Sequence, residues 1–156
     1  MKRTDDFFMS KALMQANIAL RHNEVPIGAV IVNKQGDIIA RAFNKIEEVG
    51  SQHAHAEVLA IQRASKKIGG WRLNGCFIYV TLEPCLMCTG LITLSRLDGV
   101  VFGASSELFG AGLSNIDTLP SYAKKLQIKG GVKKQECIAL LQAFFKMARK
   151  KEKGKK

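Results

Sequence analysis

The chain has 156 residues, of which 47% are hydrophobic, and carries a formal net charge of +11 at pH 7. This length supports one hydrophobic core, so we expect a single domain over residues 1–156. No stretch approaches the roughly 20 consecutive apolar residues of a membrane span, and residues 1–10 lack the apolar region of a secretory signal. We therefore expect a cytoplasmic protein, in which four cysteines argue against a disulfide framework.

The positive charge gathers at the C-terminal end. Residues 1–120 contain 12 Lys and Arg against 11 Asp and Glu, whereas residues 121–156 contain 12 against 2. Such a region attracts phosphate backbones, and the attraction weakens with salt. Residues 150–156 taken alone could equally be a solvated tail that aids solubility.

Apolar spacing predicts an alternation of helices and strands after a first helix. Expected helices cover residues 5–21, 55–67, 85–96 and 137–149, and expected strands cover residues 27–33, 38–43, 76–81 and 99–103. The polar turn around Gly36 joins the first two strands, both expected to be buried, into an antiparallel hairpin. Residues 104–131 read as a connection with a short helix near 120–126. Because strand, helix and strand in sequence favour parallel pairing, we expect a three-layer α/β/α protein with a mixed sheet of about five strands.

Two short motifs bring together residues suited to zinc. His55 and Glu57 open the second helix in Ala-His-Ala-Glu, and Cys85 and Cys88 open the third in Pro-Cys-Leu-Met-Cys. One imidazole and two thiolates form a zinc ligand set that leaves the fourth tetrahedral position open for water, as catalysis requires. A lone Cys-x-x-Cys would equally suit a redox pair or half of a structural zinc knuckle, but the chain has no second pair to complete a knuckle.

The spacing of these residues also predicts where the site lies. Cys85 and Cys88 are three apart and share a helix face near the positive end of the helix dipole, which favours thiolates. His55 and Glu57 are two apart, about 200° around a helix, so they share a site only from the first turn. We expect the metal between two helix starts at the carboxyl ends of strands.

This ligand set predicts a hydrolytic deamination. Zinc lowers the pKa of a bound water toward neutrality, so that the water attacks a ring carbon bearing an amino group, such as C6 of adenine or C4 of cytosine. Glu57 is suited to carry protons from the water to the ring and to the departing ammonia. The combination of His-x-Glu with Pro-Cys-x-x-Cys is the known signature of zinc-dependent nucleobase deaminases.

Beyond these motifs, the sequence resembles the bacterial tRNA-specific adenosine deaminases, which have the cytidine deaminase-like fold. The resemblance runs through residues 24–30, Asn44, residues 54–57, 79–85, 101–104 and 144–146. It implies conversion of adenosine to inosine at the wobble position of a tRNA anticodon, by a homodimer with one Zn²⁺ per subunit. It further implies that Asn44 and the Ala56 backbone contact a flipped nucleoside, and that Phe144, Phe145 and Lys146 belong to the RNA-binding surface.

The sequence departs from this family pattern in two loops. Ser51-Gln52-His53 replaces the usual Asp-Pro-Thr, and Ser106 and Leu108 stand where Asp and Lys are usual. Both loops could contact the substrate or the other subunit. For His53 we favour an exposed loop position over a contact with the metal ligands.

Two rival functions follow from the residues. All cytidine deaminase-like folds share the zinc motif, so the alternative enzyme is a guanine, cytosine or nucleoside deaminase. A rival of another class is a catalytically silent RNA-binding module that keeps zinc for folding.

Overall fold

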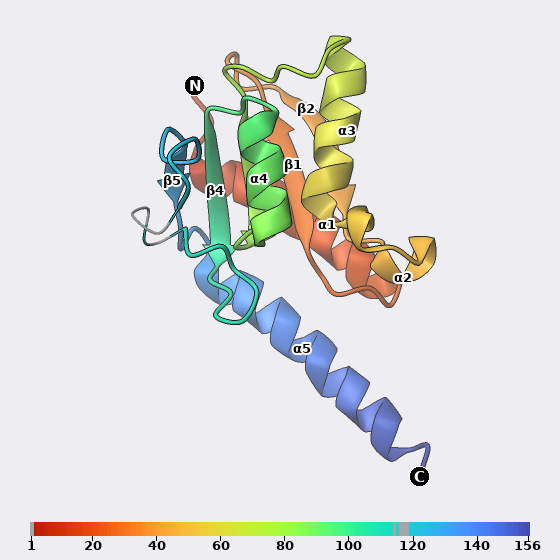
Figure 1. The fold of residues 1–156 in the computed structure, drawn as a ribbon. Coiled ribbons are helices and arrows are strands. Elements are labelled where there is room, and N and C mark those ends of the chain that lie inside the picture. The colour runs from red at the N-terminus through yellow and green to blue at the C-terminus, as the bar shows by residue number, and fades with distance from the viewer. Residues whose placement is uncertain (1, 114, 116–118) are drawn as a thin grey trace.

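The chain forms one mixed sheet with helices on both faces (Figure 1). The computed structural model describes residues 2–113, 115 and 119–156. Within these residues the strands are β1 (Gly28–Val32), β2 (Ile38–Phe43), β3 (Phe77–Leu82), β4 (Gly99–Ala104) and β5 (Gln127–Lys129). The helices are α1 (Asp5–Arg21), α2 (Ile46–Val49), the 3-10 helix η1 (Gln52–Ala54), α3 (Ala56–Ile68), α4 (Leu86–Leu94) and α5 (Lys134–Lys153). The expected three-layer α/β/α fold with a five-stranded mixed sheet is confirmed.

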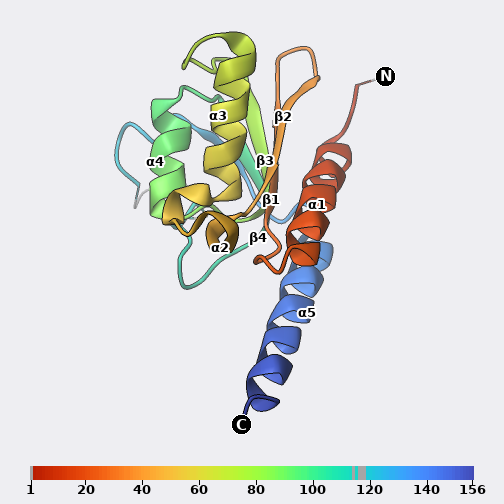
Figure 2. The same ribbon diagram turned by 90° about the vertical axis from the view of Figure 1, so that its right-hand side faces the viewer.

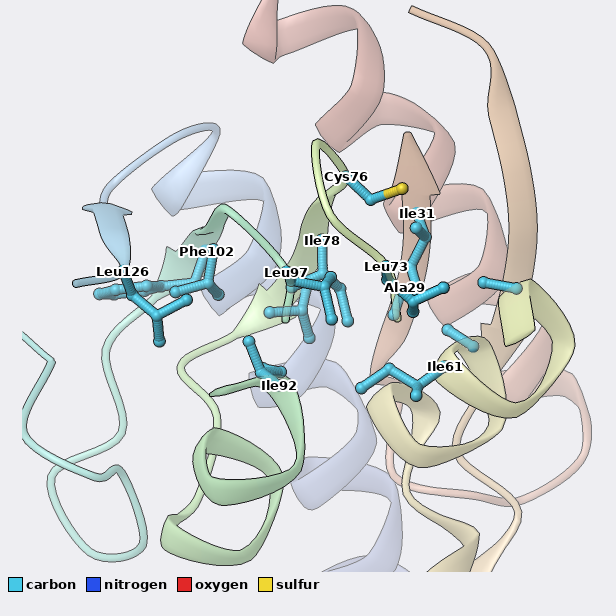
Figure 3. Close-up of a cluster of buried hydrophobic side chains, with 14 of the residues drawn as sticks. Ala29, Ile31, Ile61, Leu73, Cys76, Ile78, Ile92, Leu97, Phe102 and Leu126 are labelled. Atoms are coloured by element: carbon cyan, nitrogen blue, oxygen red, sulfur yellow. The ribbon is translucent and has the colours of Figure 1, made fainter. Parts of the chain in front are cut away.

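Alternate residues of each strand point to opposite faces of the sheet, and this period builds two cores. Figure 2 shows α3 and α4 on one face and α1 on the other. The core beneath α3 and α4, part of which is drawn in Figure 3, includes Ala29, Ile31, Ile61, Ile78, Ile92 and Phe102. The core on the opposite face includes Phe8, Met9, Val30, Tyr79, Val101 and Cys137. Both faces are covered, which explains why β1, β3 and β4 consist almost entirely of apolar residues.

The position of β1 between β2 and β3 decides how these strands pair. The sheet order is β2-β1-β3-β4-β5, and β1 pairs antiparallel with both β2 and β3. The connection from β2 through α3 therefore passes over β1 to reach β3. Across α4, β3 and β4 are parallel neighbours. The expected parallel pairing is confirmed for β3 with β4, whereas β3 pairs antiparallel on its other side, with β1.

The structure differs from the sequence-based expectation mainly in segments whose hydrophobic pattern is weak. Residues 120–126, expected to contain a short helix, form turns that lead into β5. This strand has three residues, too few to show a hydrophobic pattern, and it pairs in parallel with β4. β2 lies at the edge of the sheet, so Arg41 is exposed and Ile38 and Ile39 are only half-buried.

α5 extends well beyond the sheet, and its C-terminal half projects from the rest of the protein (Figures 1 and 2). It begins at Lys134 and ends at Lys153, so it is longer at both ends than the expected 137–149. Cys137 is its buried residue, packed against the core under α1. No helix of the described residues is long and apolar enough to cross a membrane.

Candidate metal and catalytic site

The carboxyl end of β3 leads directly into α4. β3 ends at Leu82, and the buried residues Glu83 and Pro84 carry the chain to Cys85 at the N-cap of α4. The backbone of Cys85 is extended, with φ −71° and ψ 174°, as is usual at an N-cap. Cys88 lies in the first helical turn and is fully buried. Both thiols are thereby placed at the start of α4, as the spacing predicted.

α3 begins at the same end of the sheet as α4 (Figure 1). His55 occupies its N-cap with an extended backbone, at φ −62° and ψ 147°, and Glu57 lies in the first turn. Because the N-cap backbone is not helical, the 100° step between successive helical side chains does not apply to His55. Residues only two apart can then face the same space beyond the helix start. The predicted placement of His55 and Glu57 at a helix end is confirmed.

His55, Cys85 and Cys88 form a compact cluster of possible metal ligands. His55 Nδ1 lies 3.5 Å from Cys88 Sγ and 3.8 Å from Cys85 Sγ, and the three donor atoms all lie within 4.8 Å of one another. Tetrahedral zinc, with bonds of about 2.3 Å to sulfur and about 2.0 Å to nitrogen, requires N···S separations of about 3.5 Å. The three donor atoms therefore fit one Zn²⁺ ion. Among the described residues no fourth protein ligand joins the cluster.

Hydrogen bonds within the cluster favour a thiolate at Cys85. Contacts with the Cys88 thiol and the His55 ring lower the pKa of Cys85 to about 4, although burial acts in the opposite direction. The contact with Cys85 raises the pKa of His55. The same contact, together with burial, raises the pKa of Cys88. A metal ion that binds all three side chains must displace protons, so metal binding is expected to weaken as the pH falls.

Glu57 is buried beside this cluster without belonging to it. Its side chain is 4% exposed, and burial raises the pKa of Glu57 to about 7, an effect that the charge of His55 partly opposes. A carboxyl group with a pKa near neutrality can both accept and donate a proton at physiological pH. The geometry thus separates three metal-binding side chains from one proton-exchanging side chain.

Gln52, which the sequence reasoning did not single out as a site residue, contacts the outer nitrogen of His55. Gln52 Oε1 lies 3.2 Å from His55 Nε2, on the side of the ring away from the two thiols. Neighbouring His53 is exposed, and its Nδ1 lies 2.6 Å from Ser51 Oγ rather than near the cluster. The only feature of the sequence that drew attention to this segment was its departure, at Ser51-Gln52-His53, from the pattern of the resembled family.

Asn44 and Ala56 lie on two segments that meet at the start of α3. The Lys45 amide donates a 3.0 Å hydrogen bond to the Ala54 carbonyl, which ties the end of β2 to the approach to α3. Asn44 is 2% exposed, and its side-chain Nδ2 donates to the Val25 carbonyl at 3.3 Å. The hydrogen bond between Lys45 and Ala54 brings the residue that follows Asn44 next to the residue that precedes His55.

Glu24 is a buried carboxylate that fixes α2, on the path between Asn44 and α3. It is 1% exposed and accepts hydrogen bonds from the backbone amides of Glu47 at 3.1 Å and Glu48 at 2.7 Å. These amides belong to the first turn of α2 and have no partner within the helix. A carboxylate from a distant segment thereby acts as the helix cap.

Residues 105–113 form a loop over the start of α4, and a second buried carboxylate holds it there. Glu83 accepts hydrogen bonds from the Ser106 amide at 3.1 Å and the Leu113 amide at 2.9 Å. At the tip of this loop Leu108 is 81% exposed and Phe109 is 72% exposed. The loop therefore presents an apolar tip at its exposed surface.

Phe144, Phe145 and Lys146 lie on α5, outside the metal-binding cluster. The two rings meet edge to face with centroids 5.3 Å apart, and Phe145 is 47% exposed. Phe145 and Arg149 line an open hollow of about 280 Å³, whose other wall includes Ala104 at the carboxyl end of β4. This hollow and the metal-binding cluster are at the same end of the sheet.

Comparison with known proteins agrees with this geometry. The family model for the cytidine and deoxycytidylate deaminase zinc-binding region matches residues 2–104. The tRNA-specific adenosine deaminase of Bacillus subtilis (strain 168) is 44% identical over 152 residues, which cover 96% of this chain and 94% of that protein. A solved structure from studies of A-to-I editing by tRNA:A34 deaminases at the wobble position is 37% identical, with a TM-score of 0.80 over 86% of this chain and 98% of that one. A guanine deaminase from Bacillus subtilis is 31% identical, with a TM-score of 0.64 over 81% of this chain and 83% of that one.

Proposed function

The chain belongs to the zinc-dependent tRNA-specific adenosine deaminase family, and we propose that it converts adenosine to inosine at A34, the wobble position of a tRNA anticodon. The observation that carries the chemistry is the cluster of His55, Cys85 and Cys88 with Glu57 buried beside it. We propose that residues 1–156 work as one deaminase domain in the cytoplasm, where tRNA is the substrate.

The three ligands have the role of binding the metal that activates water, and Glu57 has the role of moving protons. Zn²⁺ held by His55 Nδ1, Cys85 Sγ and Cys88 Sγ would supply a water molecule activated for attack near neutral pH. Glu57 would accept one proton from this water as the water oxygen adds to C6 of adenine, and would donate that proton to N1. It would then carry the second proton of the water to the amino group, which leaves as ammonia while the C6 carbonyl forms.

Asn44 and the Ala56 backbone are proposed to hold the flipped nucleoside. Ala56 is the first residue of α3, so its amide has no partner within the helix and is free to donate to a ligand. Asn44 is held rigidly by its buried side chain, close to the segment that precedes α3. A base taken out of its stack can be recognised by such fixed hydrogen-bonding groups.

The RNA-binding surface is proposed to include Phe144, Phe145 and Lys146 on α5. An exposed aromatic ring can stack on an unpaired base, and nearby cations can contact the phosphates. Seven Lys and Arg residues occur from Lys146 to the end of the chain. The hollow beside Phe145 opens at the same end of the sheet as the metal-binding cluster.

A tRNA editing assay tests this proposal directly. Purified protein is incubated with a total tRNA pool, and sequencing reports adenosines newly read as guanosine. We expect such changes at A34, and we expect Glu57→Gln to keep zinc while lowering the rate about 10²- to 10⁴-fold. No editing by the zinc-loaded wild type on tRNA or any nucleobase would favour the silent RNA-binding module.

A guanine or other free-base deaminase is the second candidate, favoured by the structural likeness to a guanine deaminase. It predicts turnover of small substrates, whereas the tRNA proposal predicts none for free adenosine, cytidine or guanine. Assays of ammonia release from these compounds separate the two. Rapid turnover of free guanine would overturn the tRNA assignment and leave the zinc chemistry intact.

A homodimer is proposed on the basis of α4, whose outer face is apolar. Leu86, Met87 and Leu94 are 69%, 45% and 64% exposed, which is unusual for three large apolar residues on one nine-residue helix. Light scattering is expected to give twice the mass of one chain for the wild type and the mass of one chain for Leu94→Glu. A monomeric wild type at micromolar concentration would contradict the dimer.

A further inference from the structure

We propose that Gln52 is a positioning residue for the zinc site: its side-chain carbonyl accepts the Nε2–H of His55 and holds the ring with Nδ1 toward the metal. This inference rests on the proposed zinc ligands. It concerns a residue three positions before His55 in the chain.

The two nitrogens of His55 face different partners. Nδ1 points toward the sulfurs of Cys88 and Cys85, at 3.5 and 3.8 Å, while Nε2 lies 3.2 Å from Gln52 Oε1. A nitrogen that binds a metal must offer its lone pair, so in neutral His55 the hydrogen resides on Nε2. The Gln52 carbonyl is an acceptor and matches this hydrogen. The hydrogen bond therefore selects the one tautomer that can bind zinc through Nδ1.

The local backbone explains why Gln52 reaches His55. Gln52 opens the 3-10 helix η1, and His55 follows that helix three residues later. In 3-10 geometry side chains three residues apart lie nearly above one another. The turn is closed by a hydrogen bond from the Ala54 amide to the Ser51 carbonyl, and the Lys45 amide fixes Ala54 from outside. The pair is thus held by backbone contacts that do not depend on either side chain.

The expected consequence is tighter zinc binding. Hydrogen-bond acceptors behind a metal-binding histidine fix the ring orientation and raise its basicity, and their loss typically costs 10- to 100-fold in metal affinity. Without the Gln52 carbonyl, the His55 ring would have to be ordered by the metal alone.

Three variants test the role of Gln52. Gln52→Leu removes the acceptor at similar size, Gln52→Glu keeps an acceptor, and Gln62→Leu changes an exposed glutamine on α3 as a matched control. Zinc dissociation constants are measured by competition with a chromophoric chelator, in the absence of RNA. We expect a 10- to 100-fold weaker affinity for Gln52→Leu, an affinity at least equal to wild type for Gln52→Glu, and no change for Gln62→Leu.

A second readout reports on the hydrogen bond itself. In zinc-loaded protein labelled with ¹⁵N-histidine, the Nε2–H of His55 should exchange slowly with water in the wild type and in Gln52→Glu, and quickly in Gln52→Leu. The proposal is overturned if Gln52→Leu binds zinc as tightly as the wild type, or if Gln52→Glu loses zinc to the same extent as Gln52→Leu. Because neither measurement uses RNA, failure of the tRNA assignment would leave both results interpretable.

Discussion

Thr89, in the first half of α4, is a buried polar residue whose hydroxyl has no hydrogen-bond partner among the described residues. Its side chain is 3% exposed, so the hydroxyl has lost its contacts with water and gained none in return. Thr89→Val keeps the β-branched shape and removes this unpaired group. We expect the free energy of unfolding to rise by about 1 kcal/mol, measured by urea denaturation of the zinc-loaded protein.

Thr93, one helical turn further along, provides the matched control. Its Oγ1 donates to the Thr89 carbonyl at 2.8 Å, so the same substitution there removes a hydrogen bond that exists. Thr93→Val should lower the free energy of unfolding by about 1 kcal/mol. Equal effects of the two substitutions would show that the Thr89 hydroxyl is not unpaired in solution.

At the residue scale, the sequence predicted those site residues whose role requires a particular residue type at a particular spacing. Zinc ligands and a proton carrier must come from a few residue types at fixed spacing. The sequence therefore allowed the prediction of His55, Glu57, Cys85 and Cys88 as site residues. The supporting residues were not predictable in this way. Glu24 accepts hydrogen bonds from backbone amides of α2, and Glu83 accepts them from a distant loop. No short motif distinguishes these two carboxylates from the others in the sequence.

Between elements, β1 packs closely against the backbone of α1 at Gly28. A Cβ atom at Gly28 would collide with the α1 backbone at Ala12 and Ala16 and would lie 2.8 Å from the Cβ of Gln15. Because a helix backbone cannot yield as a side chain can, Gly28→Ala is expected to destabilise the protein by about 3 kcal/mol. Thermal unfolding checks this, with Gly70→Ala, which meets nothing within 4 Å, as a control that should stay near wild type.

A polar contact joins α1 to the sheet on the same face. Asp5 accepts hydrogen bonds from Tyr79 Oη at 2.8 Å and from Lys129 Nζ at 2.6 Å. Burial alone would raise the pKa of Asp5, but these two donors outweigh it, so the pKa lies below its usual 3.8.

This contact predicts a loss of stability in acid. A carboxyl group whose pKa is lowered by folding stabilises the protein above its unfolded pKa, and the contribution disappears as the pH falls through the folded pKa. The difference in unfolding free energy between wild type and Asp5→Asn should therefore shrink as the pH is lowered from 5 toward 2. A difference independent of pH in urea titrations would contradict an ionised Asp5.

At the scale of elements, the sequence predicted the helices and strands that are long and have a regular hydrophobic period. α1 was expected over residues 5–21 and is observed there, because its apolar residues repeat with the helical period. β5 and the turn before it carry no such signal. Their structure depends on pairing with β4, a contact between residues far apart in the chain.

For the whole molecule, the projecting half of α5 and its basic end predict how RNA is captured. Truncation after Lys150 removes four lysines from an exposed segment without disturbing either core. If all four contact phosphates of a single-stranded loop, the dependence of log affinity on log salt should flatten by about 3. Filter binding of an anticodon stem-loop across a salt series measures this. If the truncated protein binds with unchanged affinity at low salt, the C-terminal residues serve solubility and do not bind RNA.

The N-caps of α3 and α4 have a consequence for the whole fold. Neither His55 nor Cys85 caps its own helix, although a capping side chain typically contributes about 1 kcal/mol. Both side chains face the metal-binding cluster, so one ion would anchor two helix starts that are 30 residues apart in the chain. Chelation should therefore speed amide hydrogen exchange in both first turns together, while the sheet stays protected. The supply of zinc in the cell would then decide how well these two helix starts withstand proteases, as well as whether the enzyme works.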